Sequence, residues 1–189
     1  MRSFDCNSDQ AIPPSDWVLR FVHLIKPGGR ILDLAAGHGR HSFYFLEQGF
    51  NVVAADIDVS SLRHKTALEG FSVLEVDLEV GHWPFHSLSF DAIVVTNYLF
   101  RPHFPWIIGS LKEMGVLLFE SFGAGNEKFG RPKNPQFLLS SGEIYNFLSE
   151  SLHVVSYEHG IENEPRRSVR QRICAVKGPG PFLLNESGK

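Results

Sequence analysis

The segment from Ile31 to Arg40, Ile-Leu-Asp-Leu-Ala-Ala-Gly-His-Gly-Arg, constrains the fold of this chain more than any other. Its apolar run predicts a buried strand, and the two glycines that follow predict a tight turn into a helix. One helix later, the run from Val52 to Asp56 predicts a second buried strand that ends in a carboxylate. Such a strand-helix-strand unit forms a crevice at the carboxyl ends of its parallel strands.

The same alternation of strand and helix patterns continues along the chain. The predicted strands cover residues 30–35, 51–57, 71–76, 90–96 and 115–120, and the predicted helices cover 15–25, 39–48, 59–67, 104–113 and 142–150. The runs 152–159 and 169–176 alternate in polarity around a polar turn, which predicts an antiparallel pair. We therefore expect an α/β fold with a Rossmann-like, doubly wound sheet of seven strands. It would be mostly parallel, with a C-terminal antiparallel hairpin and helices on both faces.

Composition bounds the protein class. With 189 residues, 43% hydrophobic and 21% charged, the chain is expected to form one globular domain over residues 15–189, after a loose leader of residues 1–14. The net charge of −3 gives no reason to expect general attraction to nucleic acid. Cys6 and Cys174 lack metal or redox spacing, and no stretch approaches the roughly 20 apolar residues of a membrane span. We expect a soluble, cytoplasmic protein without a membrane partner, and the sequence leaves its oligomeric state open.

Asp33 lies at the end of the first predicted strand, beside the glycine turn. A carboxylate there would repel the pyrophosphate of a dinucleotide, which binds against such a turn and the following helix N-terminus. A ligand with an ammonium and a sulfonium group, such as S-adenosylmethionine, would instead be attracted. Ser42 also stands where a dinucleotide-binding turn has its third glycine. These residues favour a methyl-donor site over a dinucleotide site.

Three carboxylates end the first three predicted strands in succession. Asp33 is placed to meet the ammonium of the donor, and Asp56 to accept hydrogen bonds from both ribose hydroxyls. Asp77 is placed to accept from an adenine amino group, with Leu78 supplying backbone and an apolar face. The series, together with the glycine turn, is a stronger signal than any one of these residues.

Residues 33–41, Asp56, Asp77 and the strand at 90–95 resemble the class I S-adenosylmethionine-dependent methyltransferases. The resemblance covers nearly the whole chain, including the C-terminal hairpin, and departs at Ala35, where many members carry glycine. The short chain and leading helix are most similar to small-molecule members, including tellurite-resistance-type methyltransferases. The resemblance implies S-adenosylmethionine as the cofactor, bound by Asp33, Ala35, Gly37, Gly39, Asp56, Ile57, Asp77, Leu78 and Thr96.

The loops after the fourth and fifth predicted strands are expected to face the methyl group. Candidates for binding the acceptor are His41, Tyr98, Arg101, Glu120, Arg131 and Asn134, and candidates for a catalytic role are Asn97, Tyr98, His103 and Glu120. A general base, for which His41 is a further candidate, is needed only if the acceptor is protonated. Asn97-Tyr98 partly matches the Asn-Pro-Pro-Tyr signature of amino-group methyltransferases but lacks both prolines, so we interpret the pair as pocket wall.

Residues 121–139 are rich in glycine and proline and have two interpretations. The segment forms either a lid over a small acceptor or a structural loop in which arginine and asparagine side chains bind its own backbone carbonyls. We expect no metal site, because Trp83-Pro84 argues against a helix that would bring His82 and His86 together.

Three functions remain open, led by methyl transfer to a small molecule or an inorganic chalcogen oxyanion. Arg166, Arg167, Arg170 and Arg172 form a basic patch that suggests an RNA or protein methyltransferase, although we interpret it as a solvated strand face. The third possibility is a non-catalytic S-adenosylmethionine-binding scaffold or partner subunit, because no residue is an unmistakable catalyst.

Overall fold

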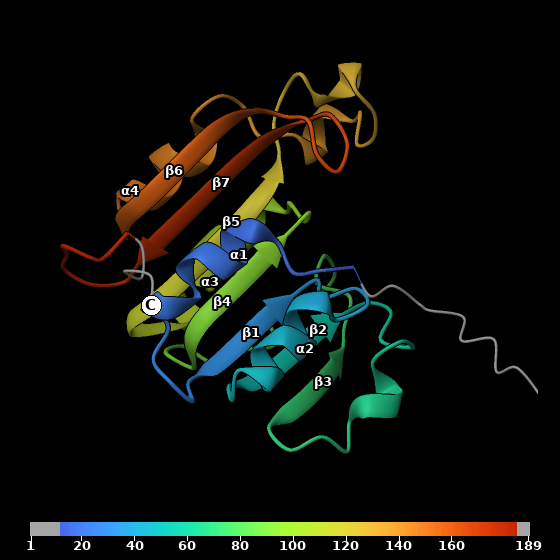
Figure 1. Cartoon of the computed structure of the whole chain (residues 1–189), viewed down its shortest axis with the longest axis vertical. Helices are drawn as coiled ribbons and strands as arrows, with labels where there is room; N and C mark the ends of the chain where they lie inside the picture. Colours follow the sequence, from blue (N-terminus) through green and yellow to red (C-terminus); the bar gives the residue numbers. More distant parts are fainter. Residues whose placement is uncertain (1–11, 185–189) are drawn as a thin grey trace, which may run out of the picture.

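The computed structural model describes residues 12–184, so residues 1–11 of the predicted leader lie outside the described part. The longer elements are α1 (Asp16–Phe21), β1 (Arg30–Leu34), α2 (Arg40–Glu47), β2 (Asn51–Asp56), β3 (Phe71–Glu75), β4 (Phe90–Thr96), α3 (Phe104–Ser110), β5 (Leu111–Phe122), α4 (Glu143–Ser149), β6 (His153–Glu162) and β7 (Ser168–Val176) (Figure 1). Short 3-10 helices lie at Val22–Leu24, Arg63–Lys65, Arg101–His103, Asn126–Lys128 and Pro135–Phe137.

The strands form one seven-stranded sheet in the order β3-β2-β1-β4-β5-β7-β6. Strands β1 to β5 run parallel to one another, whereas β7 pairs antiparallel with both β5 and β6. The expected Rossmann-like sheet with a C-terminal antiparallel pair is therefore confirmed. Since β1 has β2 on one side and β4 on the other, the chain changes direction across the sheet at the carboxyl end of β1. That switch point is where ligands bind in open α/β sheets.

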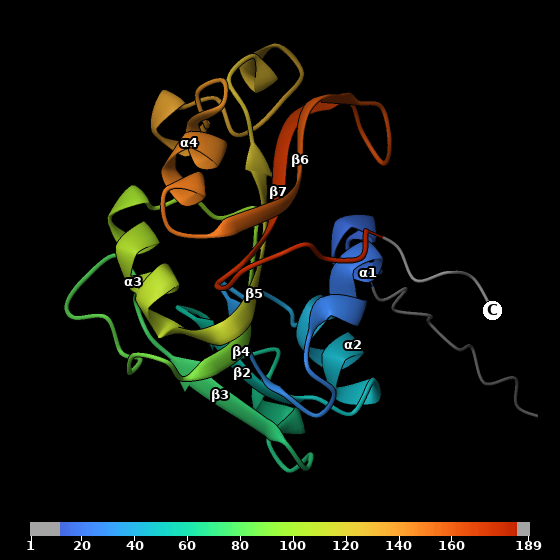
Figure 2. The same cartoon turned by 90° about the vertical axis from the view of Figure 1, so that its left-hand side faces the viewer.

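Helices cover both faces of the sheet, with α1 and α2 on one side and α3 and α4 on the other (Figure 2). Alternate residues of the central strands pack against the helices on opposite faces of the sheet. Ile31 packs into the cluster that includes Phe21 and Phe45, whereas Leu32 packs into the cluster that includes Phe119. This two-sided burial explains why neighbouring residues of β1, such as Ile31 and Leu32, are both apolar.

Two predicted helices differ from the structure. The segment 59–67 forms turns around the short 3-10 helix Arg63–Lys65 rather than a regular helix. The predicted helix 104–113 ends at Ser110, because Leu111 already pairs with Phe90 as the first residue of β5. The register then shifts between Phe90 and Ala92, where β5 has the extra residues and Met114 has a left-handed φ of 63°, before regular pairing resumes at Val116.

Each helix within residues 12–184 is too short or too polar to cross a lipid bilayer.

Candidate functional site

The turn between β1 and α2 is built from left-handed backbone. Ala35, Gly37 and Gly39 have φ angles of 56°, 56° and 78°. At Gly39 a Cβ would lie 2.6 Å from Leu62 Cδ2, so only glycine fits without displacing that side chain. The N-cap residue Gly39 has no side chain to cap α2, so the first N–H groups of the helix, before Ser42, are left for an anionic group of a ligand. At Ala35, where the sequence departs from the resembled family, the same backbone form costs about 1 kcal/mol.

Asp56 ties this turn to the end of β2. Its Oδ2 accepts a hydrogen bond from the Gly37 amide at 2.8 Å, and its Oδ1 accepts from the Asp58 amide at 3.0 Å. Each carboxylate oxygen keeps further acceptor capacity, which the expected ribose hydroxyls can use. The neighbouring Ile57 side chain is 64% exposed, so an apolar surface lies open beside the carboxylate.

Asp33 is buried below the turn with only 1% of its surface exposed. Its Oδ2 accepts a hydrogen bond from Ser42 Oγ at 2.6 Å. Burial raises the pKa of this carboxyl to about 6, and the Ser42 hydrogen bonds and Arg40 oppose that rise only in part. At neutral pH Asp33 is therefore a poorly compensated buried anion. An arriving ammonium group would be attracted to it.

The remaining expected cofactor residues lie along the same edge of the sheet. Asp77 is exposed after β3 and accepts the Glu79 amide at 2.9 Å, which holds the loop in a tight turn. Leu78 packs against the core cluster on the α3 side, and Thr96 ends β4 half-buried beside β1. The carboxyl ends of β1 to β4 thus bring all nine residues to one edge.

Two hollows adjoin this edge, next to β4 and β5. One has a volume of about 420 Å³ and is lined by Ile12, Pro13, Pro14, Ser15, Asp16, Arg40, Asn97, Glu120, Phe122, Glu162, Glu164, Pro165, Arg166, Ser168, Arg170 and Arg172. The other has about 280 Å³ and is lined by Glu79, Asn97, Tyr98, Leu99, Ser121, Phe122, Pro132 and Phe137. Asn97 and Phe122 belong to both, so these residues stand between the two hollows.

Glu120 is the centre of a buried ion-pair cluster in the larger hollow. Its Oε2 lies 3.0 Å from Arg172 Nε and 3.6 Å from Arg170 Nη2, and only 2% of the side chain is exposed. Both arginines also pair with Glu162 of β6. Burial alone would raise the pKa of Glu120, but the two arginines outweigh burial and lower the pKa below its ordinary value. Glu120 is consequently a weak proton acceptor.

This cluster was missed in the sequence, where the hairpin arginines suggested a solvated strand face. That interpretation is wrong for Arg170, which is 8% exposed and lies against the Phe122 ring with 4.4 Å between its guanidinium carbon and the ring centroid. The available signal was the spacing of two, which puts Arg170 and Arg172 on one side of a strand. The partner glutamate became visible only through the pairing of Glu120 with Arg172 across β5 and β7.

Asn97 lies directly after β4 with a left-handed φ of 58°. Its Oδ1 accepts a hydrogen bond from Arg170 Nη1 at 2.7 Å, and its backbone amide donates to the Glu120 carbonyl. Arg170 therefore fixes the orientation of the Asn97 amide. No residue in the described part of the chain accepts from Nδ2, so that group is left as a donor at the boundary of the two hollows.

Tyr98 and His103 form a pair beside the smaller hollow. Tyr98 Oη lies 3.4 Å from His103 Nδ1, and the His103 ring packs against Trp83 and Phe100. Burial lowers the pKa of His103 despite its hydrogen bond to the Leu78 backbone, and burial raises the pKa of Tyr98. At neutral pH both groups are uncharged, and both are bonded to one another or to the backbone.

His41 lies in α2, buried with 2% exposure. Its Nε2 accepts the backbone amide of Ser15 at 3.2 Å, which holds the segment before α1 at the wall of the larger hollow. Burial lowers the pKa of His41 to about 4, so the ring is neutral and its basic nitrogen is already occupied.

The segment after β5 is held by Arg101. Its guanidinium makes four hydrogen bonds, two to Glu143 and one each to the carbonyls of Gln136 and Leu138. Asn134 Oδ1 accepts the Gln136 amide within the same loop. Arg131 is exposed, and its carbonyl accepts from Arg166. Arg101 and Asn134 thus bind backbone groups of the loop, and neither lines the two hollows.

Residues 31–118 match a family model described as a methyltransferase domain. No curated protein sequence matches the chain significantly. Among solved structures, TehB from Haemophilus influenzae is similar, with 19% identity and a TM-score of 0.71 over 87% of this chain. The chain spans 62% of the length of that protein.

Two further structures show how varied proteins of this fold are. One is 1,6-didemethyltoxoflavin-N1-methyltransferase from Burkholderia thailandensis, solved with 1,6-didemethyltoxoflavin and S-adenosylhomocysteine. It has 17% identity and a TM-score of 0.63, over 86% of this chain and 76% of that protein. The other is the [4+2]-cyclase SpnF, with 14% identity and a TM-score of 0.66, over 87% of this chain and 79% of that protein. At these identities the likeness establishes the fold, and the reaction has to be argued from the site.

Proposed function

Because residues 31–118 belong to the methyltransferase domain family and the chain has the class I fold, we propose that it transfers a methyl group from S-adenosylmethionine to a small acceptor. The acceptor atom would carry a free lone pair and need no proton removal. The observation that carries this proposal is the glycine turn with its buried Asp33, next to hollows beside which the candidate bases Glu120, His41, Tyr98 and His103 are engaged by other groups. The family match and the fold indicate S-adenosylmethionine as the cofactor.

The residues at the edge fit this cofactor. The turn at 35–39 and the uncapped start of α2 suit its carboxylate, and the buried Asp33 suits its ammonium. We assign Asp56, with the exposed Ile57 beside it, to the ribose, and Asp77 with Leu78 to the adenine. When bound, the cofactor supplies a methyl group activated by a positively charged sulfur.

The hollows set the size and polarity of the acceptor. Their volumes of about 420 and 280 Å³ suit a small molecule rather than a polymer segment. Asn97 offers its Nδ2 donor to both, because its Oδ1 is already occupied by Arg170. A donor at this position favours an acceptor that presents an oxygen or another lone pair. It disfavours an amino group, which would need the occupied Oδ1.

No candidate base in the described residues is poised to remove a proton near pH 7. Glu120 is held ionised by two arginines, and His41 is bound to the Ser15 amide with a pKa of about 4. His103 and Tyr98 are bonded to one another, and burial keeps both neutral. Catalysis would then depend on positioning the acceptor and excluding water, which suffices for an in-line displacement.

Calorimetry with S-adenosylhomocysteine tests the cofactor assignment. Asp56→Ala should weaken binding at least tenfold, since it removes two charge-assisted hydrogen bonds. The matched control is Asp58→Ala, which removes a carboxylate two residues away that is hydrogen-bonded to Ser60. Unchanged affinity in Asp56→Ala would refute the ribose assignment.

The pH dependence of the reaction tests the absence of a base. For an acceptor that does not itself titrate, kcat/KM should stay level between about pH 7 and pH 9. A tenfold rise per pH unit within that window would reveal a general base and contradict this part of the proposal.

The alternatives make different predictions in a methyl-transfer assay with labelled S-adenosylmethionine. An RNA methyltransferase has less support, because Arg170 and Arg172 are paired with glutamates and are not free for phosphates. Label appearing in the small-molecule fraction of a cell extract would support our proposal, whereas label in RNA or protein would replace it. No transfer to any fraction, with S-adenosylhomocysteine still bound, would favour a non-catalytic scaffold.

A further inference from the structure

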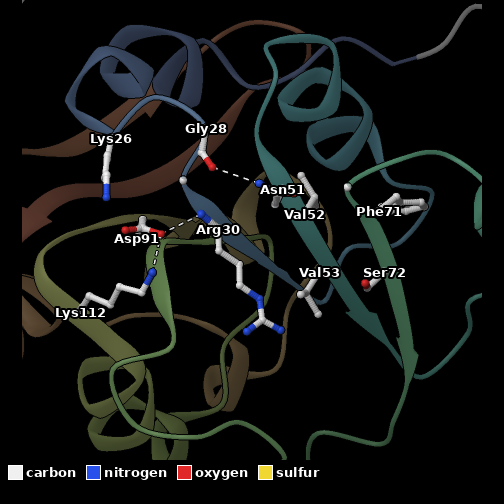
Figure 3. Close-up of a pocket in the computed structure, with 12 residues that line it drawn as sticks. Lys26, Gly28, Arg30, Asn51, Val52, Val53, Phe71, Ser72, Asp91 and Lys112 are labelled. Carbon is white, nitrogen blue, oxygen red and sulfur yellow. Dashed lines mark hydrogen bonds and ion pairs between the residues drawn. The ribbon is translucent and has the colours of Figure 1, made fainter.

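A larger hollow, of about 510 Å³, lies at the opposite edge of the sheet (Figure 3). It is lined by Lys26, Gly28, Gly29, Arg30, Asn51, Val52, Val53, Gly70, Phe71, Ser72, Asp91 and Lys112, at the amino ends of β1 to β4. Its volume is in the range of small-molecule sites. Since β1 is five residues long, the hollow lies about 16 Å from the glycine turn. It is therefore separate from the candidate cofactor site.

The backbone keeps this hollow open. At Gly29 a Cβ would lie 2.7 Å from the Lys26 carbonyl oxygen and 2.9 Å from Asp91 Cβ, so the turn before β1 can close against Asp91 only with glycine there. The connection between β3 and β4, residues 76–89, contains no helix and contributes no lining residue. Ser72 of β3 is consequently exposed beside the turn.

The charges of the hollow are unbalanced. Asp91 Oδ2 accepts hydrogen bonds from Lys112 Nζ at 2.7 Å and from the Arg30 amide at 2.8 Å, so Asp91 and Lys112 largely satisfy one another. Lys26 is near enough to influence Asp91 electrostatically, but no described residue forms a hydrogen bond or ion pair with its ammonium. Three cationic side chains thus face one carboxylate.

Arg30 carries the strongest free donor group. Its guanidinium carbon lies 5.2 Å from the centroid of the Phe90 ring, and no described residue accepts a hydrogen bond from it. Figure 3 shows this side chain reaching into the hollow between Lys112 and Val53. Stacking on a ring orients the guanidinium while leaving its N–H edges free, and that fork matches two oxygens of a phosphate group.

We propose that this hollow binds the phosphate group of a small molecule. Arg30 would hold the phosphate oxygens, Lys26 on the other side of Asp91 would add positive charge to the hollow, and the Ser72 hydroxyl would hydrogen-bond another part of the ligand. The side chain of Val53, which packs in the same core cluster as Phe90, would contact the remainder of the ligand. This site does not depend on methyl transfer, and its ligand would bind with the cofactor site either empty or filled.

Calorimetry with inorganic pyrophosphate and with AMP, at low ionic strength, tests the site. The double variant Lys26→Gln/Arg30→Gln should lose at least tenfold in affinity for both probes, since the charge-assisted contact of Arg30 and the nearby positive charge of Lys26 both disappear. Both side chains are exposed, so the variant should fold. The single variant Lys26→Gln, with a severalfold loss expected, provides the same test if the double variant does not. Arg20→Gln is the matched control, because Arg20 also stacks on a ring but is paired with Glu158.

Unchanged affinity for S-adenosylhomocysteine in the double variant would show that the lost binding is not at the glycine turn. Failure of the wild-type protein to bind either probe would overturn the proposal, as would equal affinity of the double variant and the wild type. Binding of citrate as tight as that of pyrophosphate would overturn the assignment to phosphate, since it would reflect general attraction of anions.

Discussion

The buried carboxylate of Asp33 makes the stability of this protein depend on pH in a predictable direction. Its pKa is about 6 in the folded chain against an ordinary value of 3.8. Protonation therefore favours the folded state, fully below about pH 4, and this stabilisation is lost as the pH rises through about 6. Relative to the protonated group, ionised Asp33 lowers the free energy of unfolding by about 3 kcal/mol at pH 8, and the loss at pH 5 is about half of that.

Asp33→Asn removes the charge and keeps an oxygen that accepts the Ser42 hydroxyl. The variant should be about 1–3 kcal/mol more stable than the wild type at pH 8, because the neutral amide forms a weaker hydrogen bond but has no buried charge. Urea unfolding at pH 8 and pH 5 measures this difference, and the gain should shrink at the lower pH. The same variant should bind S-adenosylhomocysteine about tenfold more weakly, since the ammonium loses its counter-charge.

Asp91→Asn is the matched control with the opposite sign. Although partial burial raises the pKa of Asp91, its bonds to Lys112 and the Arg30 amide lower it further than burial raises it. Its stabilising effect is thus present above its unfolded pKa and lost as the pH falls through its folded pKa. Asp91→Asn should destabilise the protein at pH 8. A loss of stability in Asp33→Asn at pH 8, or a gain equal at both pH values, would refute the reasoning.

Two further substitutions test the glycine turn and the loop after β5. Gly39→Ala should lower the free energy of unfolding by about 2–3 kcal/mol, because a clash with Leu62 adds to the left-handed φ. Gly49 also has a left-handed φ, of 81°, but a Cβ there would meet no atom within 4 Å, so Gly49→Ala should lower the free energy of unfolding by only about 1 kcal/mol. Equal losses for the two variants in urea unfolding would contradict this explanation. Arg101→Gln removes the hydrogen bonds from Arg101 to the carbonyls of Gln136 and Leu138, so limited proteolysis within residues 134–143 should be severalfold faster. The global free energy of unfolding should not change. An unchanged rate of cleavage would show that Arg101 does not hold the loop.

Much of the candidate site was predictable because its residues depend on local order alone. Asp33 and Asp56 lie near the ends of β1 and β2, and Asp77 follows β3. The apolar run of each strand is visible in the sequence, and parallel strands bring their carboxyl ends to one edge. The glycine turn is equally local, since its positive φ angles restrict the residue type at each position. The strand boundaries at 90–96 agree with the structure for the same reason.

The acceptor side was not predictable, because it depends on register between distant strands. Glu120 meets Arg172 only through the antiparallel pairing of β5 with β7, and Arg170 reaches Asn97 from a strand 73 residues further along the chain. Alternation showed that the two arginines share one side of their strand but not that this side is buried. The roles of Arg101 and Asn134 likewise depend on how the loop folds back.

The hollow at the other edge is the clearest case of a property that no local pattern carries. Its cations are Lys26 in the turn before β1, Arg30 at the start of β1 and Lys112 at the start of β5. Lys112 is more than 80 residues further along the chain than the other two. The sequence alone determined the order of strands and helices and the acidic edge, because periodicity and turn chemistry act between near neighbours. Only the tertiary structure decided which charges are paired and which remain free, because ion pairing depends on the distances that strand register and loop packing set.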